Sequence, residues 1–386
     1  MDVARLRASW RSAEALGDSV PEYFYAALFV ASPDLRELFP ASMSAQRDRL
    51  FAALGRIVSS VDDSSSLVTY LHQMGADHRR FDVDAKDYPV VGAALLTTLA
   101  HFLGETWTED LAADWGEAYQ LVAAVMQEGA AAAAGRPPVW NAEVITHRRT
   151  APDIAFIEIA PYQPYPYRSG QSVPLESPLR PKVWRYYSPA SAPRADGSLE
   201  LHVRAVPGGD LSPALVYSLA PHMVVHLGAP TGVDLSLDPT SNRPLLLVAG
   251  GTGLAPLRSL IDELAVTARK RRTTLILGAR TARDLYDLPA LNRFAERHDW
   301  LTVIPVVAGA PQTPEYHGSP AEALPMVPGL SEHEAYVCGP PGMVGDVKTY
   351  LATAGIPDHD IHSERAGSPT APVRAEVLQP DEVLSR

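Results

Sequence analysis

The sequence predicts three consecutive domains: an all-α domain, an antiparallel β-barrel, and an α/β domain with a parallel sheet. Three observations indicate this order. Apolar side chains recur at helical spacing up to about residue 132. Short strands follow, among which Leu199–Val206 alternates with a period of two. From Arg243 onward, fully apolar strands alternate with helical segments, as in a parallel sheet. A length of 386 residues suits two or three domains of roughly 150 residues each.

The first domain is expected to span residues 1–134. Its end is marked by Gly135-Arg136-Pro137-Pro138, because a glycine followed by paired prolines stops a helix. Several helices with few strand signals predict an all-α domain, for which globin packing is one solution. Residues at helical spacing that share one face fall in three sets: Gln46, Leu50 and Leu54; Val91, Leu95 and Leu99; and Leu111, Trp115, Tyr119, Val122 and Met126.

The second and third domains are expected at 137–236 and 240–366. Strands are predicted at Val139–Ile145 and Ile154–Ile159, and their spacing favours a small antiparallel barrel. In the third domain, the apolar strand Pro244–Ala249 leads through a glycine-rich turn into a helix over Leu257–Thr267. Further buried strands are predicted at Thr273–Gly278, Leu301–Val307 and Ala335–Cys338. The tail, 367–386, is rich in serine, proline and glutamate, and it is expected to be disordered.

Bulk composition excludes several kinds of protein. The net charge of −12 argues against a surface for nucleic acid or anionic membranes. No apolar run is long enough to cross a bilayer, and the N-terminus lacks the pattern of a signal peptide. The single cysteine, Cys338, allows no internal disulfide, which fits a reducing compartment. We therefore expect a cytoplasmic protein with no integral membrane segment.

His78 is the first candidate for a metal-binding residue. Leu71, Met74 and His78 stand at i, i+3 and i+7, so a helix would place them on one face. An imidazole at the end of an apolar face is well placed to ligate a metal or a haem iron. A hydrogen-bonded core histidine would give the same pattern, and spacing alone does not decide between the two.

Three later motifs are suited to binding phosphate-containing cofactors. In Arg185-Tyr186-Tyr187-Ser188, the guanidinium could pair with a diphosphate, a ring could pack on a flavin, and the hydroxyl could bond the flavin ring. The alternative is a surface arginine beside two core tyrosines. Gly250–Pro256 runs from strand into helix, where glycines allow close approach of a diphosphate. Cys338-Gly339-Pro340 ends a late strand, although most free cysteines are simply buried apolar residues.

These motifs, in this order, resemble the bacterial flavohaemoglobins, in which a globin domain is fused to a module of the ferredoxin reductase superfamily. The globin resemblance rests on Phe24–Phe39, Gln46–Phe51, His78 and Tyr88. It implies that His78 is the proximal iron ligand. Residues implied to line the distal or proximal side of the haem are Tyr25, Phe39, Gln46, Leu50 and Tyr88.

The reductase part of the resemblance implies two further sets of residues. Glu364 matches an acidic residue near the flavin, although a plain surface carboxylate is the alternative. The implied flavin contacts are Arg185, Tyr186, Tyr187, Ser188, Gly209 and Ser212. The implied nucleotide contacts are Gly251, Thr252, Gly253, Leu254, Ala255, Pro256, Cys338, Gly339 and Pro340.

The resemblance implies haem b, FAD and NAD(P)H as cofactors and a nitric oxide dioxygenase activity. Hydride would pass to FAD and single electrons to haem, and O2 and NO would yield nitrate without an obligatory protein partner. Tyr25 and Gln46 would hold the diatomic substrate. Alternatives are a haem–flavin enzyme of other nitrogen-oxide chemistry, such as an NO reductase of secondary metabolism, a redox or oxygen sensor, and an electron donor to another protein. Arg280 and Arg283 leave the choice between NADH and NADPH open.

The sequence also departs from the family pattern. The glutamate that usually supports the proximal histidine falls on Ala130, with Glu128 two positions away. Ser172 stands where a tyrosine is common, and Arg365-Ala366-Gly367 replaces an aromatic residue expected near the flavin. Because a carboxylate makes the ligand imidazole more basic, we expect weaker electron donation to the iron than in a typical member.

Overall fold

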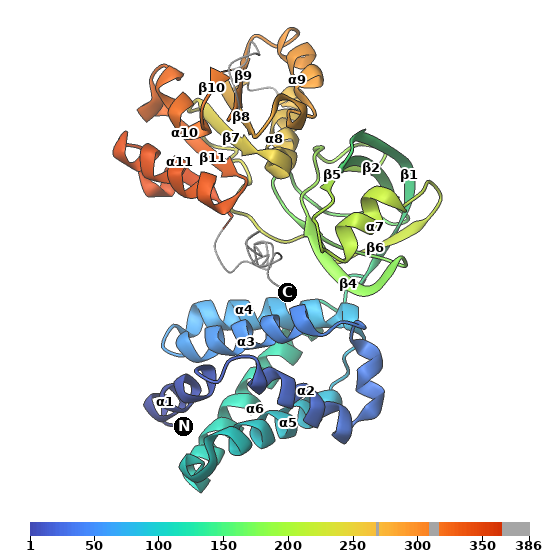
Figure 1. Ribbon diagram of the computed structural model, residues 1–386, viewed down its shortest axis with the longest axis vertical. Coiled ribbons are helices and arrows are strands. Elements are labelled where there is room, and N and C mark those ends of the chain that lie inside the picture. The colour runs from blue at the N-terminus through green and yellow to red at the C-terminus, as the bar shows by residue number, and fades with distance from the viewer. Residues whose placement is uncertain (268–269, 309–315, 365–386) are drawn as a thin grey trace, which may run out of the picture. The chain divides into compact units, whose positions relative to one another are not determined.

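The computed structural model describes residues 1–267, 270–308 and 316–364. The chain forms two compact units, Met1–Val139 and Trp140–Arg386. The second unit contains two parts, an antiparallel barrel and a parallel sheet with helices (Figure 1). The tail at 367–386 and the segment Arg365-Ala366-Gly367 lie outside the described residues.

The first unit is helical throughout its described elements, as the sequence predicts. Its core is apolar and includes Leu6, Trp10, Phe24, Leu99 and Trp115, all of which are buried. The prediction of an all-α first domain is therefore confirmed. The elements are α1 (Val3–Glu14), α2 (Ser19–Ala31), η1 (Pro33–Leu38), α3 (Ser44–Ser59), α4 (Ser64–His78), η2 (Arg79–Phe81), α5 (Asp87–Leu103), η3 (Gly104–Thr106) and α6 (Glu109–Ala132).

Helices α4 and α6 cross at unusually short range, and two glycines make this possible. A Cβ atom added to Gly75 would lie 1.8 Å from the carbonyl oxygen of Met126, and one added to Gly129 would lie 2.3 Å from that of His72. Real Cβ atoms do not approach backbone this closely, so the crossing requires a residue without a side chain at both positions. The helix that ends in His78 is therefore fixed against α6 by backbone contact.

The Gly75→Ala substitution should destabilise the helical unit, because either helix must move away to make room for the methyl group. We expect a loss of roughly 2–4 kcal/mol, in the range of overpacked core sites, measured by urea unfolding followed by far-UV circular dichroism. Gly116→Ala is the matched control. A Cβ there meets nothing within 4 Å, so alanine should leave stability unchanged or raise it by up to about 1 kcal/mol. Equal stability of the two variants would contradict this account of the crossing.

The barrel of the second unit is one antiparallel sheet with the strand order β4-β3-β6-β1-β2-β5. Its two outer strands approach each other where Pro189, just past β4, bridges Leu201 of β5, and the amide of Ala190 donates to the Glu200 carbonyl at 2.7 Å. The sheet therefore curls toward closure, as predicted. Its elements are β1 (Trp140–Ala151), β2 (Ile154–Pro161), β3 (Val173–Ser177), β4 (Arg180–Tyr187), β5 (Leu199–Arg204), α7 (Leu211–Tyr217) and β6 (Val224–Leu227).

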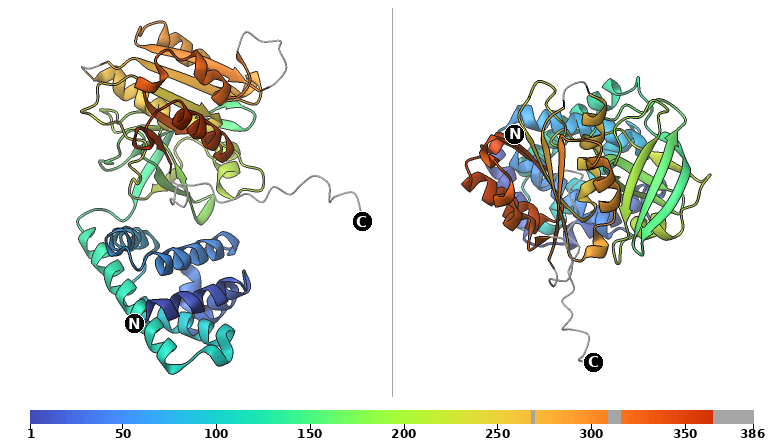
Figure 2. Two further views of the ribbon diagram at one scale, coloured as in Figure 1. Left: turned by 90° about the vertical axis from the view of Figure 1, so that its left-hand side faces the viewer. Right: turned by 90° about the horizontal axis from the view of Figure 1, so that it is seen from above.

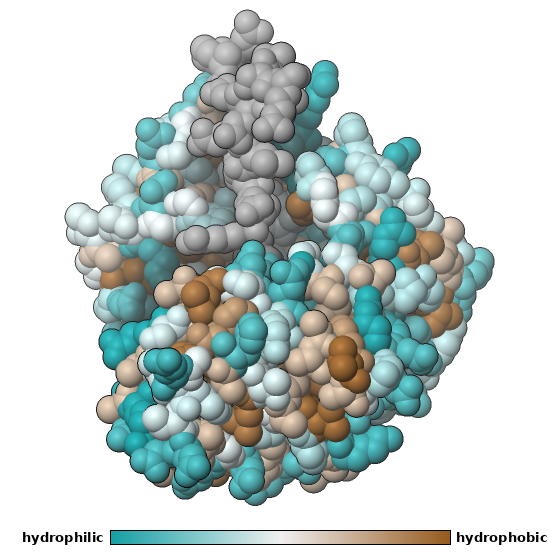
Figure 3. Space-filling view, turned by 60° about the horizontal axis from the view of Figure 1, so that its bottom comes forward, coloured by the Kyte–Doolittle hydropathy of each residue, from teal (hydrophilic) through white to brown (hydrophobic). Residues whose placement is uncertain are grey.

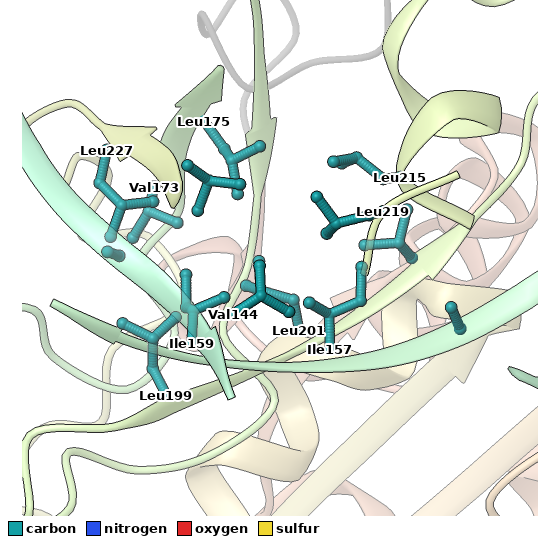
Figure 4. Packing of buried hydrophobic residues seen from close by; sticks show 14 of the residues in the cluster. Val144, Ile157, Ile159, Val173, Leu175, Leu199, Leu201, Leu215, Leu219 and Leu227 are labelled. Atoms are coloured by element: carbon teal, nitrogen blue, oxygen red, sulfur yellow. The ribbon is translucent and has the colours of Figure 1, made fainter. Parts of the chain in front are cut away.

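The barrel interior is filled by aliphatic side chains from every strand and from α7 (Figure 4). Alternate residues of one strand point inward, so Leu199, Leu201 and Val203 of β5 are all fully buried. Leu215 of α7 fills the same core. The flavin motif at 185–188 thus comes from a strand whose position is fixed by this packing.

The third part is a parallel sheet with the order β10-β9-β8-β7-β11-β12. Helices α8 and α9 cover one face, and α10 and α11 cover the other (Figure 2). This confirms the predicted α/β domain. The remaining elements are β7 (Leu245–Gly250), η4 (Gly251–Gly253), α8 (Leu254–Val266), β8 (Thr273–Ala279), η5 (Ala282–Asp284), α9 (Leu288–Ala295), β9 (Leu301–Val307), β10 (Tyr316–His317), α10 (Pro320–Ala323), η6 (Leu324–Met326), η7 (Leu330–Glu332), β11 (Glu334–Cys338), α11 (Pro341–Thr353), η8 (Asp358–Asp360) and β12 (Ile361–Ser363).

Strand β7 shows why its sequence is apolar at every position. Leu245, Leu247 and Ala249 belong to the core under α8 and α9, whereas Leu246 and Val248 belong to the core under α10 and α11. A strand covered on both faces loses the alternation of polar and apolar residues. Its carboxyl end, where the glycine turn begins, is therefore held from both sides.

Figure 3 shows one face of the molecule coloured by hydropathy. Among the described residues on this face, hydrophilic residues separate small groups of apolar ones. Scattered apolar residues of this kind are normal and do not mark a docking surface. Among the described helices, none is long and apolar enough to cross a membrane.

Candidate functional site

His78 is the last residue of α4, and the tautomer of its imidazole can be assigned from its hydrogen bond. Nδ1 lies 2.7 Å from the carbonyl oxygen of Met74. A carbonyl can only accept, so Nδ1 carries the proton and Nε2 keeps its lone pair. Burial lowers the pKa of His78, which favours the neutral ring. A neutral imidazole with a fixed Nδ1–H and a lone pair on Nε2 is the form that binds iron.

The groups around the predicted proximal side of His78 include no contact to Glu128. Glu128 is exposed, and its carboxylate lies 3.6 Å from Nε2 of His72 rather than beside His78. The carbonyl of Tyr88 accepts a 2.5 Å hydrogen bond from the hydroxyl of Tyr119, which fixes the start of α5. The proton on Nδ1 of His78 therefore rests on a neutral backbone carbonyl.

Arg79, the residue after His78, connects α4 to the end of the helical unit. One guanidinium nitrogen of Arg79 donates to the carbonyl of Ala133 at 2.5 Å, and another donates to that of Arg136 at 3.0 Å. These carbonyls lie at and beyond the end of α6, where helical partners are missing. Arg79 therefore holds the peptide that leaves the helical unit against the end of α4.

Tyr25 lies in a cluster of aromatic rings on the predicted distal side. Its ring is buried and packs edge-on against Phe39, at 5.4 Å between centroids. Its hydroxyl donates a long hydrogen bond, 3.4 Å, to the backbone carbonyl of Gln46. Burial raises the pKa of Tyr25 to about 12, so the hydroxyl stays protonated and can donate to a ligand. The structure thus brings together Tyr25, Phe39 and the backbone of Gln46.

The apolar side chains of α3 fit a flat apolar cofactor. Only Val58 of this helix is buried, whereas Leu50, Phe51 and Leu54 are half-buried even though they pack on the apolar core. Helix α3 lies beside α4, where the Arg56 guanidinium lies 4.0 Å from the centroid of the Tyr70 ring. A partly exposed apolar helix face of this kind suits a haem plane.

The Arg185–Ser188 motif lies at the end of β4. Because side chains alternate along a strand, Arg185 and Tyr187 point to one side and Tyr186 to the other. Tyr187 packs on the barrel core, and burial raises the pKa of its hydroxyl. Nη2 of Arg185 lies 3.8 Å from the Asp210 carboxylate, a long and partly exposed pair. The guanidinium remains within reach of a phosphate group, so the motif fits a flavin diphosphate.

The turn at Gly209 and Ser212 folds on itself beside Arg185. Gly209 donates from its amide to the Val206 carbonyl at 3.0 Å, and the Ser212 hydroxyl accepts from the Val206 amide at 3.1 Å. The structure therefore uses the Ser212 side chain to close the turn. A contact to a diphosphate from this turn would come mainly from backbone N–H groups.

Ser172 has a hydrogen-bond partner that the sequence does not reveal. Its buried hydroxyl lies 2.9 Å from the hydroxyl of Ser188, the last residue of the flavin motif. No local pattern predicts this pair, because sixteen residues separate its members.

The glycine turn after β7 and the turn after β11 meet backbone to backbone. Gly251 has a φ of +56°, which favours glycine. A Cβ on Gly253 would lie 2.4 Å from the carbonyl oxygen of Cys338. Adjacent parallel strands bring both turns to one sheet edge, with Cys338 paired to Ala249. Such a crevice at the carboxyl ends of strands is where dinucleotides bind.

The nucleotide contacts implied by the sequence separate into two groups in the structure. The side chains of Leu254, Ala255 and Pro256 are buried in the first turn of α8, so these residues can offer only backbone atoms or apolar support. Thr252 and the turn at Gly339 and Pro340 are partly or fully exposed. The helix begins three residues earlier than the sequence predicts, because the turn tightens into η4.

Glu364 and Cys338 lie close to each other at the end of the parallel sheet. Burial, followed by the negative charge of Asp234, raises the pKa of Glu364 to about 7. Burial, followed by the charge of Glu364, raises the pKa of the Cys338 thiol. Both groups are therefore neutral in weakly acidic solution, and Glu364 is poised to ionise near neutral pH. Asp234 was missed by sequence reasoning because it belongs to no motif.

The pH dependence of flavin reduction should change when Glu364 is replaced by glutamine. The folded pKa of about 7 lies above the ordinary 4.5, so the stabilisation gained by protonation is complete below about pH 4.5 and is lost as the pH rises through 7. As the pH rises from about 4.5 to above 7, the unfolding free energy of the wild type should fall relative to that of Glu364→Gln. Its rate of NADH-driven ferricyanide reduction should also show a step near pH 7 that the variant lacks. The exposed Glu296→Gln is the control, and a shared step in all three proteins would contradict the assignment.

Comparisons with known proteins agree with this organisation. Residues 22–126 match the Globin family model, 142–233 match the Oxidoreductase FAD-binding domain, and 247–349 match the Oxidoreductase NAD-binding domain. The chain is 27% identical to the flavohemoprotein of Bordetella pertussis over 382 residues, which cover 91% of this chain and 94% of the relative. Residues of the second unit resemble reductase component 1 of terephthalate 1,2-dioxygenase from Comamonas, at 31% identity over 60% of this chain and 69% of the relative.

A solved structure shares the whole architecture. The flavohemoglobin of Malassezia yamatoensis, determined with bound FAD and heme, superposes with a TM-score of 0.75 at 19% identity and covers 94% of this chain and 97% of its own. A globin joined to FAD-binding and NAD-binding oxidoreductase domains defines a haem–flavin oxidoreductase. The chain belongs to the flavohaemoglobin family, as the resemblance of its motifs indicates. Its cofactors are haem, FAD and a nicotinamide nucleotide, and the residues described above fit all three.

Proposed function

We propose that this protein is a nitric oxide dioxygenase that uses electrons from NAD(P)H to convert NO and O2 to nitrate. The observation that carries the proposal is the protonated, buried hydroxyl of Tyr25 in the same chain as a complete flavin and nucleotide reductase. A sensor would not need that reductase. The stoichiometry balances: one NAD(P)H, two NO and two O2 give NAD(P)⁺, two nitrate ions and one proton.

The cofactors, when bound, supply an iron that binds diatomic gases and a flavin that divides a hydride into single electrons. Each side chain has a role that follows from its position. His78 offers Nε2 to the iron, with its Nδ1–H held by Met74. Tyr25 would donate a hydrogen bond to the diatomic substrate. Its ring packs edge-on against Phe39, and apolar surroundings strengthen such a bond. Gln46, at the start of α3, would supply a second polar group.

The decisive experiment measures NO removal with an electrode and nitrate by ion chromatography, using purified protein, NADH or NADPH, and O2. We expect catalytic NO consumption with nitrate as the product. No acceleration over free haem plus flavin would refute the proposal. Products other than nitrate would favour a different nitrogen-oxide chemistry, and NADH oxidation that requires an added protein acceptor would favour an electron donor.

Tyr25→Phe removes the distal hydroxyl and keeps the aromatic packing. We expect the rate of NO consumption at limiting O2 to fall roughly tenfold, which corresponds to the loss of one buried hydrogen bond of about 1–2 kcal/mol. Tyr23→Phe is the matched control, since Tyr23 lies on the same helix with its ring stacked on His101. If both variants behave like the wild type, the Tyr25 hydroxyl takes no part in the reaction.

A further inference from the structure

Among the described residues of the second unit, three polar contacts near the cofactor motifs connect the barrel to the parallel-sheet part. We call them the interlobe latch: Ser191 with Ser259, His202 with Tyr286, and Arg204 with Asp284. The barrel residues follow the flavin motif or belong to β5, and the others lie on α8 or in the segment between β8 and α9. Polar contacts that are buried between two lobes fix their relative position more strictly than apolar packing does, because a shift leaves polar groups unpaired.

The first pair joins residues that lie a few positions after the flavin motif and after the glycine turn. The hydroxyl of Ser259, which is fully buried, donates to the carbonyl of Ser191 at 2.8 Å. Ser191 stands three residues after Ser188, and Ser259 stands six residues after Gly253 on the helix that starts at the glycine turn. The Ser191 hydroxyl accepts from the Glu200 amide at 3.1 Å, so this segment is also tied to β5. A shift of α8 would therefore be transmitted to the flavin motif.

The second pair is a histidine held on both ring nitrogens. Nε2 of His202 lies 3.0 Å from the Glu200 carboxylate, and Nδ1 lies 3.1 Å from the Tyr286 hydroxyl. A carboxylate accepts, so Nε2 carries the proton and Nδ1 accepts from the tyrosine. The side chain of His202 is only 1% exposed, and its ring stacks on Phe156 with 3.9 Å between centroids. Tyr286 packs on the same apolar core as Cys338.

The third pair is an ion pair at the edge of the same interface. Nη2 of Arg204 donates to Asp284 at 3.1 Å, and its Nε lies 3.5 Å from Asp153. Asp284 also closes the turn η5 by accepting from the Thr281 hydroxyl at 2.8 Å. A partly exposed ion pair contributes little by itself, so the buried Ser259 pair and the part-buried His202 pair dominate the connection.

We propose that Ser259 and Tyr286 are positioning residues for hydride transfer: through Ser191 and His202 they set the distance between the nucleotide turns and the flavin motif. The inference rests on the cofactor sites proposed above. In the transfer, a C–H bond of the dihydronicotinamide breaks and an N–H bond to the flavin forms, so the nucleotide loses two electrons and the flavin gains them. Rates of such steps fall steeply when the reacting atoms are misplaced by a fraction of an ångström to 1 Å.

The test compares Ser259→Ala, Tyr286→Phe and the double variant as full-length proteins loaded with FAD. Flavin bleaching by NADH or NADPH is followed anaerobically by stopped flow, with dithionite as a reductant that needs no nucleotide site. We expect the limiting rate with nucleotide to fall roughly tenfold in each single variant and the long-wavelength nicotinamide–flavin absorbance to weaken. Bleaching by dithionite should stay unchanged. The double variant should fall by less than the product of the single effects, because the two contacts fix one geometry.

Matched controls are Tyr350→Phe on α11 and Ser331→Ala, which are exposed residues of the same lobe outside the latch. Far-UV circular dichroism identifies a variant that fails to fold. If Ser259→Ala fails to fold, Tyr286→Phe still provides the test, because it removes only a hydroxyl and keeps the ring packing. A limiting rate within twofold of the wild type, with only a lower melting temperature, would show a merely structural role and overturn the inference. The assay involves neither NO nor haem, so a wild type that bleaches with nucleotide but consumes no NO would refute the proposed function alone. A wild type that no nucleotide bleaches would overturn both.

Discussion

His78→Ala should yield a protein that purifies with FAD but without tightly held haem. The expected loss is large because Nε2 of His78 is the iron ligand that we propose. The Met74 carbonyl, 2.7 Å from Nδ1, fixes the ring tautomer that leaves the Nε2 lone pair free. NO consumption should fall by more than roughly 100-fold, whereas NADH-driven ferricyanide reduction, which uses only the second unit, should persist. The measurement is the Soret absorbance per protein, before and after dithionite and CO.

The matched control for this prediction is His101→Ala. His101 also lies in the helical unit, where its ring stacks on Tyr23, but no argument makes it a ligand. It should retain haem in full. A His78→Ala protein with a complete, CO-responsive haem would refute the assignment of the ligand, and the proposed reaction would lose its iron site.

Gly253→Ala should abolish nucleotide-driven flavin reduction while leaving the haem spectrum intact. Gly253 has a φ of −60°, so alanine meets no conformational obstacle, and the effect must come from space. Its Cβ would lie 2.4 Å from the Cys338 carbonyl oxygen, which is backbone and cannot rotate away. The two turns must separate, and we expect the rate of flavin bleaching by NADH to fall by roughly 100-fold or more.

Gly345→Ala on α11 is the control for that substitution, since a Cβ there meets nothing within 4 Å. It should bleach with NADH at the wild-type rate. Isothermal titration with NAD⁺ or NADP⁺ separates lost binding from lost positioning in Gly253→Ala. Normal bleaching of Gly253→Ala would show that the contact between the two turns does not matter for the nucleotide.

Long periodic segments of the fold could be predicted from the sequence, whereas short elements could not. Strand β7 could be predicted because every residue in it is apolar. Strand β9 could be predicted because it is rich in β-branched residues. The three-residue strand β12 and the four-residue β6 carry too few residues for a pattern, and their pairing partners define them. Helix α8 starts at Leu254, earlier than predicted, because the glycine turn forms the 3₁₀ helix η4 that leads directly into it. Tertiary packing determines this local conformation.

The candidate site divides in the same way. Motifs with fixed spacing, such as Arg185–Ser188, could be found by resemblance because their function constrains neighbouring residues. Contacts between distant residues could not: Ser172 with Ser188, and His202 with Tyr286, belong to no local pattern. The lack of a proximal glutamate stays a prediction from the resemblance. The contact of His78 Nδ1 with the Met74 carbonyl, one helical turn earlier, comes from the structure alone.

The hydrogen bonds of Arg79 have a practical consequence for anyone who isolates the helical part. A shortened protein that stops at residue 134 would keep the acceptor at Ala133 and lose the one at Arg136, so Arg79, next to His78, would keep only one of its two hydrogen bonds. Spectra of such a fragment would report a helix α4 that is held less firmly than in the full chain. A cut after Val139 keeps both acceptors in place.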